Sequence, residues 1–361
     1  MAHPSNFRAA RLVGLTAAAV TALSWFACTD RGEQPTGPAA GQPNFSAAQA
    51  QTALSQVMAI QNRHTAQLMA LPGVVGTATG LDNAGHPVVL VFTRAPGLAG
   101  IPSTLEGAAV ETRVTGDLTA LYPDQTPKAG GGRSTKLTNR IRPVPNGVSV
   151  SNNNECAAGT LGAAVLINGV KYALSNNHVF ARENAAAIGE PIVQPGRYDN
   201  KPKCANKVAT DQIGTLAGFE PIVFSAGANN VIDAAVAIAT TDLTCSTTAA
   251  FYGSPSATTD TASLGLAVQK VGRTSGLTTG TIVGINATVT VGYPNGSARF
   301  VSQMVTSSRF SRAGDSGSLI VTNDGTNRPV GLLFAGSSDG TTIGNPIGPV
   351  LARFGAGICS L

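Results

Sequence analysis

The sequence predicts a mainly β protein in which a small α+β region precedes a larger all-β domain. From Gly147 onward, short runs rich in Val, Thr and Ala are broken by glycine, asparagine and proline, the pattern of short antiparallel strands. Residues 46–71 instead carry apolar side chains at helical spacing. Only 12% of the residues are charged, 5% are aromatic and 42 are glycine, and this composition favours a β-rich exported chain.

Residues 1–27 have the composition of a secretion signal. Two arginines give it a basic start, and residues 12–27 are apolar and alanine-rich but short for a membrane-spanning helix. The segment ends at Ala27-Cys28, which resembles a bacterial lipoprotein signal and predicts lipidation of Cys28, with ordinary cleavage as the alternative. Residues 28–45 are rich in glycine, proline and polar side chains, and we expect them to form a disordered tether.

Residues 46–122 are expected to form a small α+β accessory or pro-like domain. A capping-box pattern at Ser46 and Gln49 starts a helix, and Pro72-Gly73 ends it. Three strands follow, at residues 73–81, 87–93 and 108–115. No chemistry is evident here, and only its position suggests a prodomain, inhibitor-like or docking role.

Residues 123–144 form a linker rich in proline, glycine and basic side chains, a segment that proteases could cut. The all-β domain is expected to span residues 145–361. It opens with a hairpin in which strands 160–167 and 170–175 flank Asn168-Gly169, a two-residue turn signal. Further strands are expected at 280–291, 300–306, 318–321 and 329–334.

Charge and cysteine content bound the partners and the compartment. The formal net charge is only +5, and no Lys/Arg-rich run with interleaved aromatics argues for nucleic acid binding. If Cys28 carries lipid, four cysteines remain, and in an exported chain they imply two disulfides with three possible pairings. The four are Cys156, Cys204, Cys245 and Cys359. Zinc is the alternative, but the chain has no Cys-x-x-Cys or paired histidine, and we expect no metal.

The turn Gly314-Asp315-Ser316-Gly317 runs into an apolar strand and presents a candidate nucleophile, Ser316. Its glycines allow backbone conformations that a side chain would forbid. A serine needs a base, and of the four histidines only His178 lies in the same part of the chain. The candidate acid is Asp233, which would be costly to bury unpaired in its apolar run. The simpler interpretations are that the Ser316 turn is only a surface turn, that His178 is a strand-end histidine, and that Asp233 faces water at a strand edge.

The order His178, Asp233, Ser316, with the Gly-Asp-Ser-Gly turn, resembles the chymotrypsin-like (trypsin-like) serine proteases. A further stretch, residues 271–282, is similar to the Gly-Arg-Thr-Thr-Gly…Gly-Thr-Ile run of bacterial streptogrisin-like members. The resemblance covers about residues 145–361 and implies a double six-stranded β-barrel. Asn-Asn-His-Val replaces the family's Ala-Ala-His-Cys, and Gly-Asp-Ser-Gly-Ser replaces Gly-Asp-Ser-Gly-Gly. These departures concern the substrate range and the local disulfide more than the triad.

The resemblance implies a serine endopeptidase that forms an acyl-enzyme. Ser316 would attack the scissile carbonyl, His178 would take and return the proton, and Asp233 would orient the imidazole. The N–H groups of Gly314 and Ser316 would form the oxyanion hole. No metal or organic cofactor is needed for this chemistry.

Two structural expectations also follow from the resemblance. Streptogrisin-like relatives support the active turn with an internal arginine, which here implies a buried ion pair between Arg273 and Asp315. Family members often close a loop around the histidine, and this favours the disulfide pairing Cys156–Cys204 and Cys245–Cys359.

The same analogy places a specificity pocket. Phe310 would lie at its base, and Phe334, Ala335 and Gly336 would form its far wall. No acidic residue stands at the base, so a preference for Arg or Lys is not expected. Phe310 would instead favour small or apolar residues. The family usually has a serine at the position aligned with Phe334.

Two other classes of protein stay open from the sequence. The domain could be an inactive protease fold that binds partners at the cell surface, although all three triad residues are present. It could also be an esterase that uses the same triad. For the main reading, the partner is a polypeptide substrate, and the only membrane contact is a lipid anchor at Cys28. The expected location is the cell envelope or the medium; the sequence gives no oligomeric state.

Overall fold

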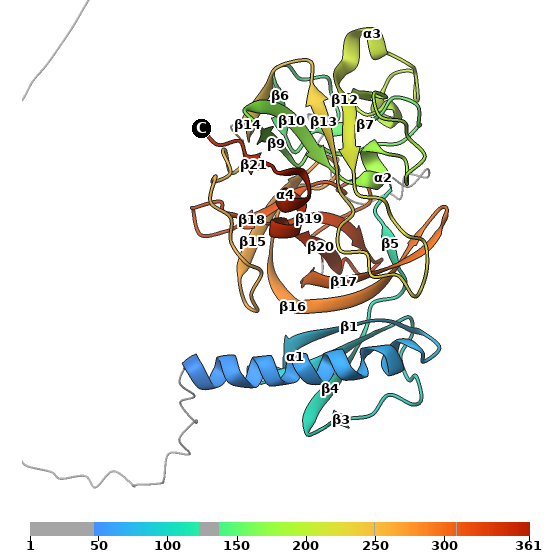
Figure 1. Cartoon of the computed structure of the whole chain (residues 1–361), viewed down its shortest axis with the longest axis vertical. Helices are drawn as coiled ribbons and strands as arrows, with labels where there is room; N and C mark the ends of the chain where they lie inside the picture. The colour runs from blue at the N-terminus through green and yellow to red at the C-terminus, as the bar shows by residue number, and fades with distance from the viewer. Residues whose placement is uncertain (1–46, 123–136, 249, 308) are drawn as a thin grey trace, which may run out of the picture. The chain divides into compact units, whose positions relative to one another are not determined.

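The computed structural model of the chain describes residues 47–122, 137–248, 250–307 and 309–361 (Figure 1). These residues belong to one unit, Ser46–Leu361. The expected secretion signal, Cys28, the 28–45 tether and most of the 123–144 linker lie outside the described residues.

The region before the main domain contains the predicted helix and strands. Helix α1 (Ala47–Met69) packs along strands β1 (Val74–Leu81) and β2 (Pro87–Thr93). Strand β4 (Ala108–Val114) pairs in parallel with β2, and the short β3 (Thr104–Leu105) pairs with β4. The helix covers one face of this small sheet because apolar side chains of α1 and of alternate β2 residues share one buried cluster.

The other face of this sheet is also buried. Val88, Leu90 and Phe92 of β2 point opposite to Val89 and Val91 and belong to a second cluster, which includes barrel residues. Strand β1 is hydrogen-bonded to β16 (Gly276–Tyr293), so the accessory strands continue the sheet of the second barrel. The sequence showed both elements but not this continuity.

The first half of the main domain is an eight-stranded sheet in the order β21-β9-β10-β13-β12-β11-β7-β8. At one edge, Gly147 N–H donates to Leu161 O and Leu161 N–H donates to Val148 O at 2.7 and 2.8 Å, which extends the pairing of β7 with β8. The predicted hairpin is present, with Asn168 and Gly169 both at positive φ between β9 and β10. The strands are β7 (Ser149–Asn152), β8 (Gly159–Thr160), β9 (Ala163–Ile167), β10 (Val170–Ser175), β11 (Pro191–Val193), β12 (Gln212–Phe219), β13 (Ala235–Ala239) and β21 (Gly357–Ile358).

The second half is a closed six-stranded antiparallel barrel. Its strands pair in the order β15-β18-β19-β20-β17-β16, and β16 pairs back with β15. Besides β16, they are β15 (Ala267–Gly272), β17 (Gly296–Thr306), β18 (Leu319–Thr322), β19 (Pro329–Gly336) and β20 (Thr342–Pro346). The prediction of a mainly β, trypsin-like double barrel after a small α+β region is therefore confirmed.

Shorter elements complete the fold. Strand β5 (Leu118–Ala120) pairs with both β16 and β19, and β6 (Val144–Asn146) pairs with β14 (Leu243–Thr247). The remaining helices are α2 (Asn177–Phe180), η1 (Arg197–Asp199), α3 (Val208–Asp211) and α4 (Ile347–Phe354). Within the described residues, none of the helices combines the length and the apolar character that crossing a membrane requires.

The two expected disulfides are both present. Cys156 is bonded to Cys204, and Cys245 is bonded to Cys359. The second bond ties the C-terminal end of the chain to strand β14 of the first half. Disulfides of this kind fit an oxidising compartment and hence an exported chain.

Candidate active site

His178 and Asp233 form a buried pair between neighbouring strands. His178 lies in the one-turn helix α2 directly after β10, and Asp233 lies just before β13, the partner of β10. The distance from His178 Nδ1 to Asp233 Oδ2 is 2.6 Å, and the His178 backbone N–H donates to Oδ1 at 3.2 Å. Both side chains are buried, so the carboxylate orients the ring from within the core.

Asp233 is held by further polar partners that the sequence did not indicate. The Tyr293 hydroxyl donates to Asp233 Oδ2 at 3.0 Å, and burial together with this carboxylate raises the pKa of Tyr293, which keeps its proton available. The Asp233 backbone is fixed on both sides, since its N–H donates to Asn345 Oδ1 and its carbonyl accepts from Asn176 Nδ2. A water-facing aspartate at the strand edge is therefore the wrong reading.

Ser316 stands in a tight turn that requires glycine on both sides. Gly314 and Gly317 have φ of 93° and 91°. A Cβ at Gly317 would lie 2.2 Å from the Thr160 carbonyl oxygen, so a side chain does not fit there. The Ser316 carbonyl accepts from Thr160 N–H at 2.7 Å, which joins the turn to β8 of the first half.

The serine and the histidine are not hydrogen-bonded to each other. The Ser316 hydroxyl donates to the Phe334 carbonyl at 3.1 Å. His178 Nε2 is buried and has no hydrogen-bond partner among the described residues. Two of the three candidate catalytic residues are thus directly linked, and the third presents its hydroxyl to strand β19.

The prediction that Arg273 pairs with Asp315 is wrong, because the cation that pairs with Asp315 is Lys270. Lys270 Nζ lies 2.8 Å from Asp315 Oδ2, and both side chains are completely buried. Burial alone would raise the pKa of Asp315, but the Lys270 charge and the Ser275 hydrogen bonds outweigh it and hold the pKa below the ordinary value. Burial lowers the pKa of Lys270, and Asp315 opposes that shift.

Arg273 pairs instead with a residue of the first half. It lies in the turn between β15 and β16, and its guanidinium binds the Asp199 carboxylate with both Nε and Nη2. It still lies against the active turn, because a Cβ at Gly314 would meet Arg273 Nη1 at 2.4 Å. Both arginine and aspartate are almost fully buried.

Residues 119–122 of the same chain lie beside strand β19 and the Ser316 turn, and the place that they occupy is called the cleft below. Strand β5 runs antiparallel to β19, with Thr119 opposite Gly336 and Ala120 opposite Ala335. Leu121 follows β5: its N–H donates to the Phe334 carbonyl at 3.3 Å, and its carbonyl accepts from Gly314 N–H at 2.7 Å. The Gly314 N–H that the resemblance assigns to the oxyanion hole thus binds a peptide carbonyl here.

The next residue covers the histidine. The ring of Tyr122 lies over His178, with ring centroids 5.0 Å apart. Its hydroxyl donates to Glu183, whose second carboxylate oxygen accepts from Asn295 N–H at 3.2 Å. Nearby, burial raises the pKa of Glu155, against the effect of His178.

The residues expected to form the specificity pocket divide into two groups. Phe310 is buried in the same apolar cluster as Leu121, and a Cβ on Gly336 would lie 3.4 Å from the Leu121 methyl carbons. Phe334 offers its carbonyl to the cleft, but its side chain belongs to a different cluster, with its ring centroid 4.7 Å from that of Phe300. Ala335 belongs to that second cluster as well. Of the four predicted pocket residues, only Phe310 and Gly336 are therefore associated with Leu121 in this way.

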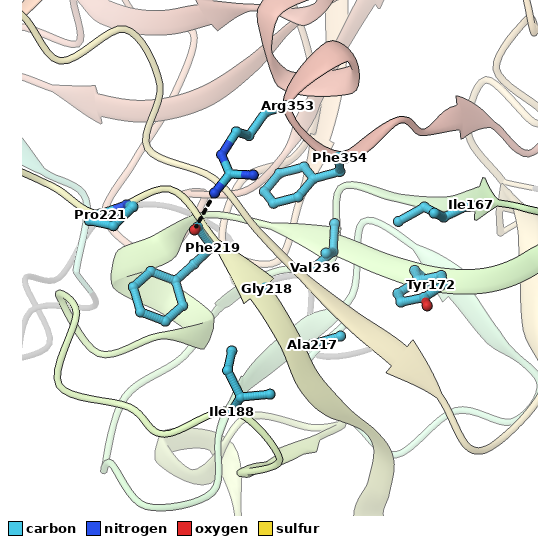
Figure 2. Close-up of a pocket in the computed structure, with 10 residues that line it drawn as sticks. All are labelled: Ile167, Tyr172, Ile188, Ala217, Gly218, Phe219, Pro221, Val236, Arg353 and Phe354. Atoms are coloured by element: carbon cyan, nitrogen blue, oxygen red, sulfur yellow. Dashed lines mark hydrogen bonds between the residues drawn. The ribbon is translucent and has the colours of Figure 1, made fainter.

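A separate open hollow lies on the first half of the domain. Figure 2 shows it between β12 and α4, where the Arg353 guanidinium donates to the Phe219 carbonyl at 3.4 Å. Its lining residues include none of His178, Asp233 and Ser316. No group of three or more His, Cys, Asp or Glu side chains that could hold a metal occurs in the described part of the chain.

One family model matches a segment of the second barrel. The Nal1 C-terminal domain family matches residues 257–348, a segment that includes Ser316 but neither His178 nor Asp233. No curated protein matches the chain.

Among solved structures, the chain is similar to a glutamic acid specific serine protease that uses a histidine triad in substrate binding. The identity is 19% and the TM-score 0.43, over 60% of this chain and 100% of that one. Thermobifida fusca Protease A is 21% identical with a TM-score of 0.42, over 60% and 99% of the two chains. A Nocardiopsis protease is 22% identical with a TM-score of 0.43, over 60% and 99%.

Proposed function

We propose that the chain is a serine endopeptidase that cleaves peptide bonds through Ser316, His178 and Asp233. The observation that carries the proposal is the hydrogen bond between His178 Nδ1 and Asp233. Because Nδ1 donates to the carboxylate, the neutral ring keeps its lone pair on Nε2, the atom that must accept a proton from a nucleophile.

Ser316 would act after its hydroxyl turns from the Phe334 carbonyl toward His178 Nε2. Its oxygen would then attack the substrate carbonyl while the proton passes to the imidazole. Asp233 would stabilise the imidazolium, and the N–H groups of Gly314 and Ser316 would bind the developing oxyanion. Return of the proton to the leaving amine completes acylation, and water reverses these steps to release the acid. No metal or organic cofactor takes part.

If the chain is exported, as we expect, its polypeptide substrate lies outside the cytoplasm. Two disulfides are compatible with export, and the composition of residues 1–27 favours a signal. We expect a cell-envelope or secreted protein, anchored by lipid where Cys28 is modified.

Labelling and substrate turnover test this proposal together. Wild type, Ser316→Ala and an exposed-serine control, Ser338→Ala, are treated with a fluorophosphonate, then offered casein and a short-chain ester. Because Leu121 fills the cleft, the same assays are run on Leu121→Asp, whose charged side chain disfavours the apolar site. We expect labelling and casein cleavage in all but Ser316→Ala. Absence of labelling in every variant would indicate a binding protein, and labelling with ester turnover alone would indicate an esterase; either result would refute the proposal.

A further inference from the structure

We propose that the Leu121–Tyr122 bond is the chain's own cleavage site, and that the residues around it display the enzyme's specificity: a leucine-like residue before the bond and a phenol after it. This inference rests on the proposed function. It is carried by the way residues 118–122 lie across the proposed active site.

The backbone of this segment is bound by the groups that a peptide substrate needs. Antiparallel pairing with β19 fixes the direction of the segment. The Leu121 N–H and carbonyl are each bonded, to the Phe334 carbonyl and to Gly314 N–H. Since Gly314 lies two residues before Ser316, the turn that carries the nucleophile also holds this one carbonyl. The carbonyl carbon of Leu121 is therefore the position presented for attack.

The side chain of Leu121 identifies the residue type accepted before the bond. It is only 8% exposed, and all other buried members of its cluster are apolar. They are Val268, Ile282, Met304, Phe310, Ile320, Val330 and Leu333. An ionised side chain would lose its hydration against this apolar surface, which disfavours Lys, Arg, Asp and Glu. Phe310 belongs to the same cluster, and a Cβ at Gly336 would lie 3.4 Å from the two Leu121 methyl carbons.

Tyr122 indicates which residue type the enzyme prefers on the C-terminal side of the cleaved bond. Its ring covers His178, and its hydroxyl donates to Glu183, which is itself 7% exposed. Burial and the Glu183 carboxylate raise the pKa of Tyr122, so the phenol stays protonated and remains a donor. A residue without a hydroxyl or other donor at this place would leave the buried carboxylate with one bond fewer.

The reaction is a hydrolysis with no oxidant or reductant. Ser316 Oγ bonds to the Leu121 carbonyl carbon and gives its proton to His178. The C–N bond to Tyr122 breaks, and the same proton passes to the Tyr122 nitrogen. Water then gives one proton to His178 and its hydroxyl to the acyl carbon. The bond between that carbon and Ser316 Oγ breaks, and His178 passes the proton to Oγ. The products are one chain that ends in the Leu121 carboxylate and one that begins with the Tyr122 amine.

Intact-mass and N-terminal sequence measurements on the full-length protein test the site. We expect wild type to yield a fragment that begins at Tyr122, and Ser316→Ala to stay uncut. Leu121→Asp should slow this cut at least about 100-fold, because a carboxylate must enter the apolar cluster. Thr112→Asp is the control: a carboxylate introduced at an exposed threonine of β4, outside residues 118–122, should leave the cut unchanged. Leu121→Met should retain cleavage, and Tyr122→Phe should slow it several-fold.

The outcomes separate this inference from the proposed function. A wild type that reacts with fluorophosphonate and cleaves casein, yet stays intact at Leu121–Tyr122 or is cut at another bond, would overturn the inference and leave the proposed function standing. Cleavage of Leu121→Asp at the wild-type rate would also overturn it. Failure of the proposed function would instead show as loss of labelling in wild type and Leu121→Asp alike.

Discussion

Replacing Lys270 with methionine should destabilise the protein strongly, although Lys270 touches no part of the cleft. Its ammonium lies 2.8 Å from the Asp315 carboxylate, and neither side chain is exposed. Methionine keeps the aliphatic length but leaves a buried carboxylate without its counter-charge. Removing one partner of such a pair typically costs about 3–5 kcal/mol.

The structure places the expected cost at the lower end of that range. Four other donors remain on the Asp315 carboxylate: the Ser275 hydroxyl and the N–H groups of Thr274, Ser275 and Arg312. We therefore expect a loss of about 3 kcal/mol in the free energy of unfolding. For a folded unit of this size that corresponds to a fall in Tm of roughly 4–5 °C. The rate of fluorophosphonate labelling should fall too, because Asp315 fixes the turn that holds Gly314 N–H.

Urea and thermal unfolding in a Ser316→Ala background measure the stability effect without self-cleavage. Lys171→Met is the matched control, since Lys171 makes a part-exposed pair with Asp242 at 3.3 Å and such pairs contribute at most about 1 kcal/mol. Adding Asp315→Asn to Lys270→Met should cost much less than the sum of the single losses. The reasoning is refuted if the free energy of unfolding of Lys270→Met lies within about 0.5 kcal/mol of the value for its parent. It is also refuted if the double variant loses the sum of the two single-variant losses.

Three further predictions concern other parts of the site and fold. Tyr293→Phe removes a buried hydrogen bond to the Asp233 carboxylate and should lower the free energy of unfolding by about 1.5–3 kcal/mol together with casein turnover; unchanged values would contradict it. Cys359→Ser should destabilise by about 1 kcal/mol more than Cys204→Ser, since their disulfides span 114 and 48 residues, and equal Tm shifts would argue against this loop-length account. Because the folded pKa of Asp315 lies below its ordinary 3.8, its stabilising effect is full at neutral pH and is lost as pH falls through that lowered pKa. The stability gap between wild type and Asp315→Asn should therefore shrink in acid titrations below about pH 4, and a constant gap would contradict it.

The strands and the three candidate catalytic residues could be predicted because each has a local signal. Alternating apolar runs, the Asn168-Gly169 turn and the glycines around Ser316 restrict the backbone directly. His178 could be chosen by elimination, and the apolar run around Asp233 indicated a carboxylate that would need a partner. Of these residues, the structure links His178 and Asp233 directly.

The partner of Asp315 could not be predicted in the same way. Lys270 and Arg273 lie three residues apart, and the motif alone does not say which one points inward. Strand β15 ends at Gly272, so Arg273 enters the turn and reaches Asp199 in the other half of the domain, while Lys270 faces the interior of the barrel. The available signal was Lys270, a lone cation within residues 268–271. If that strand is buried, its ammonium needs a counter-charge.

The segment in the cleft has the weakest signal of all, and its position changes how the whole structure is interpreted. Strand β5 has only three residues. Leu118 and Ala120 are buried and Thr119 is exposed, an alternation too short to identify a strand from the sequence. It pairs in parallel with β16 and antiparallel with β19, whereas β1 pairs with another part of β16. The accessory region thus reaches the proposed active site along a sheet that it already shares with the barrel. Because Leu121 bonds the turn that carries Ser316 and Tyr122 packs on His178, a substrate can reach these residues only after this segment has moved or been cut. The open hollow in Figure 2 does not offer another route, since none of the three candidate catalytic residues lines it.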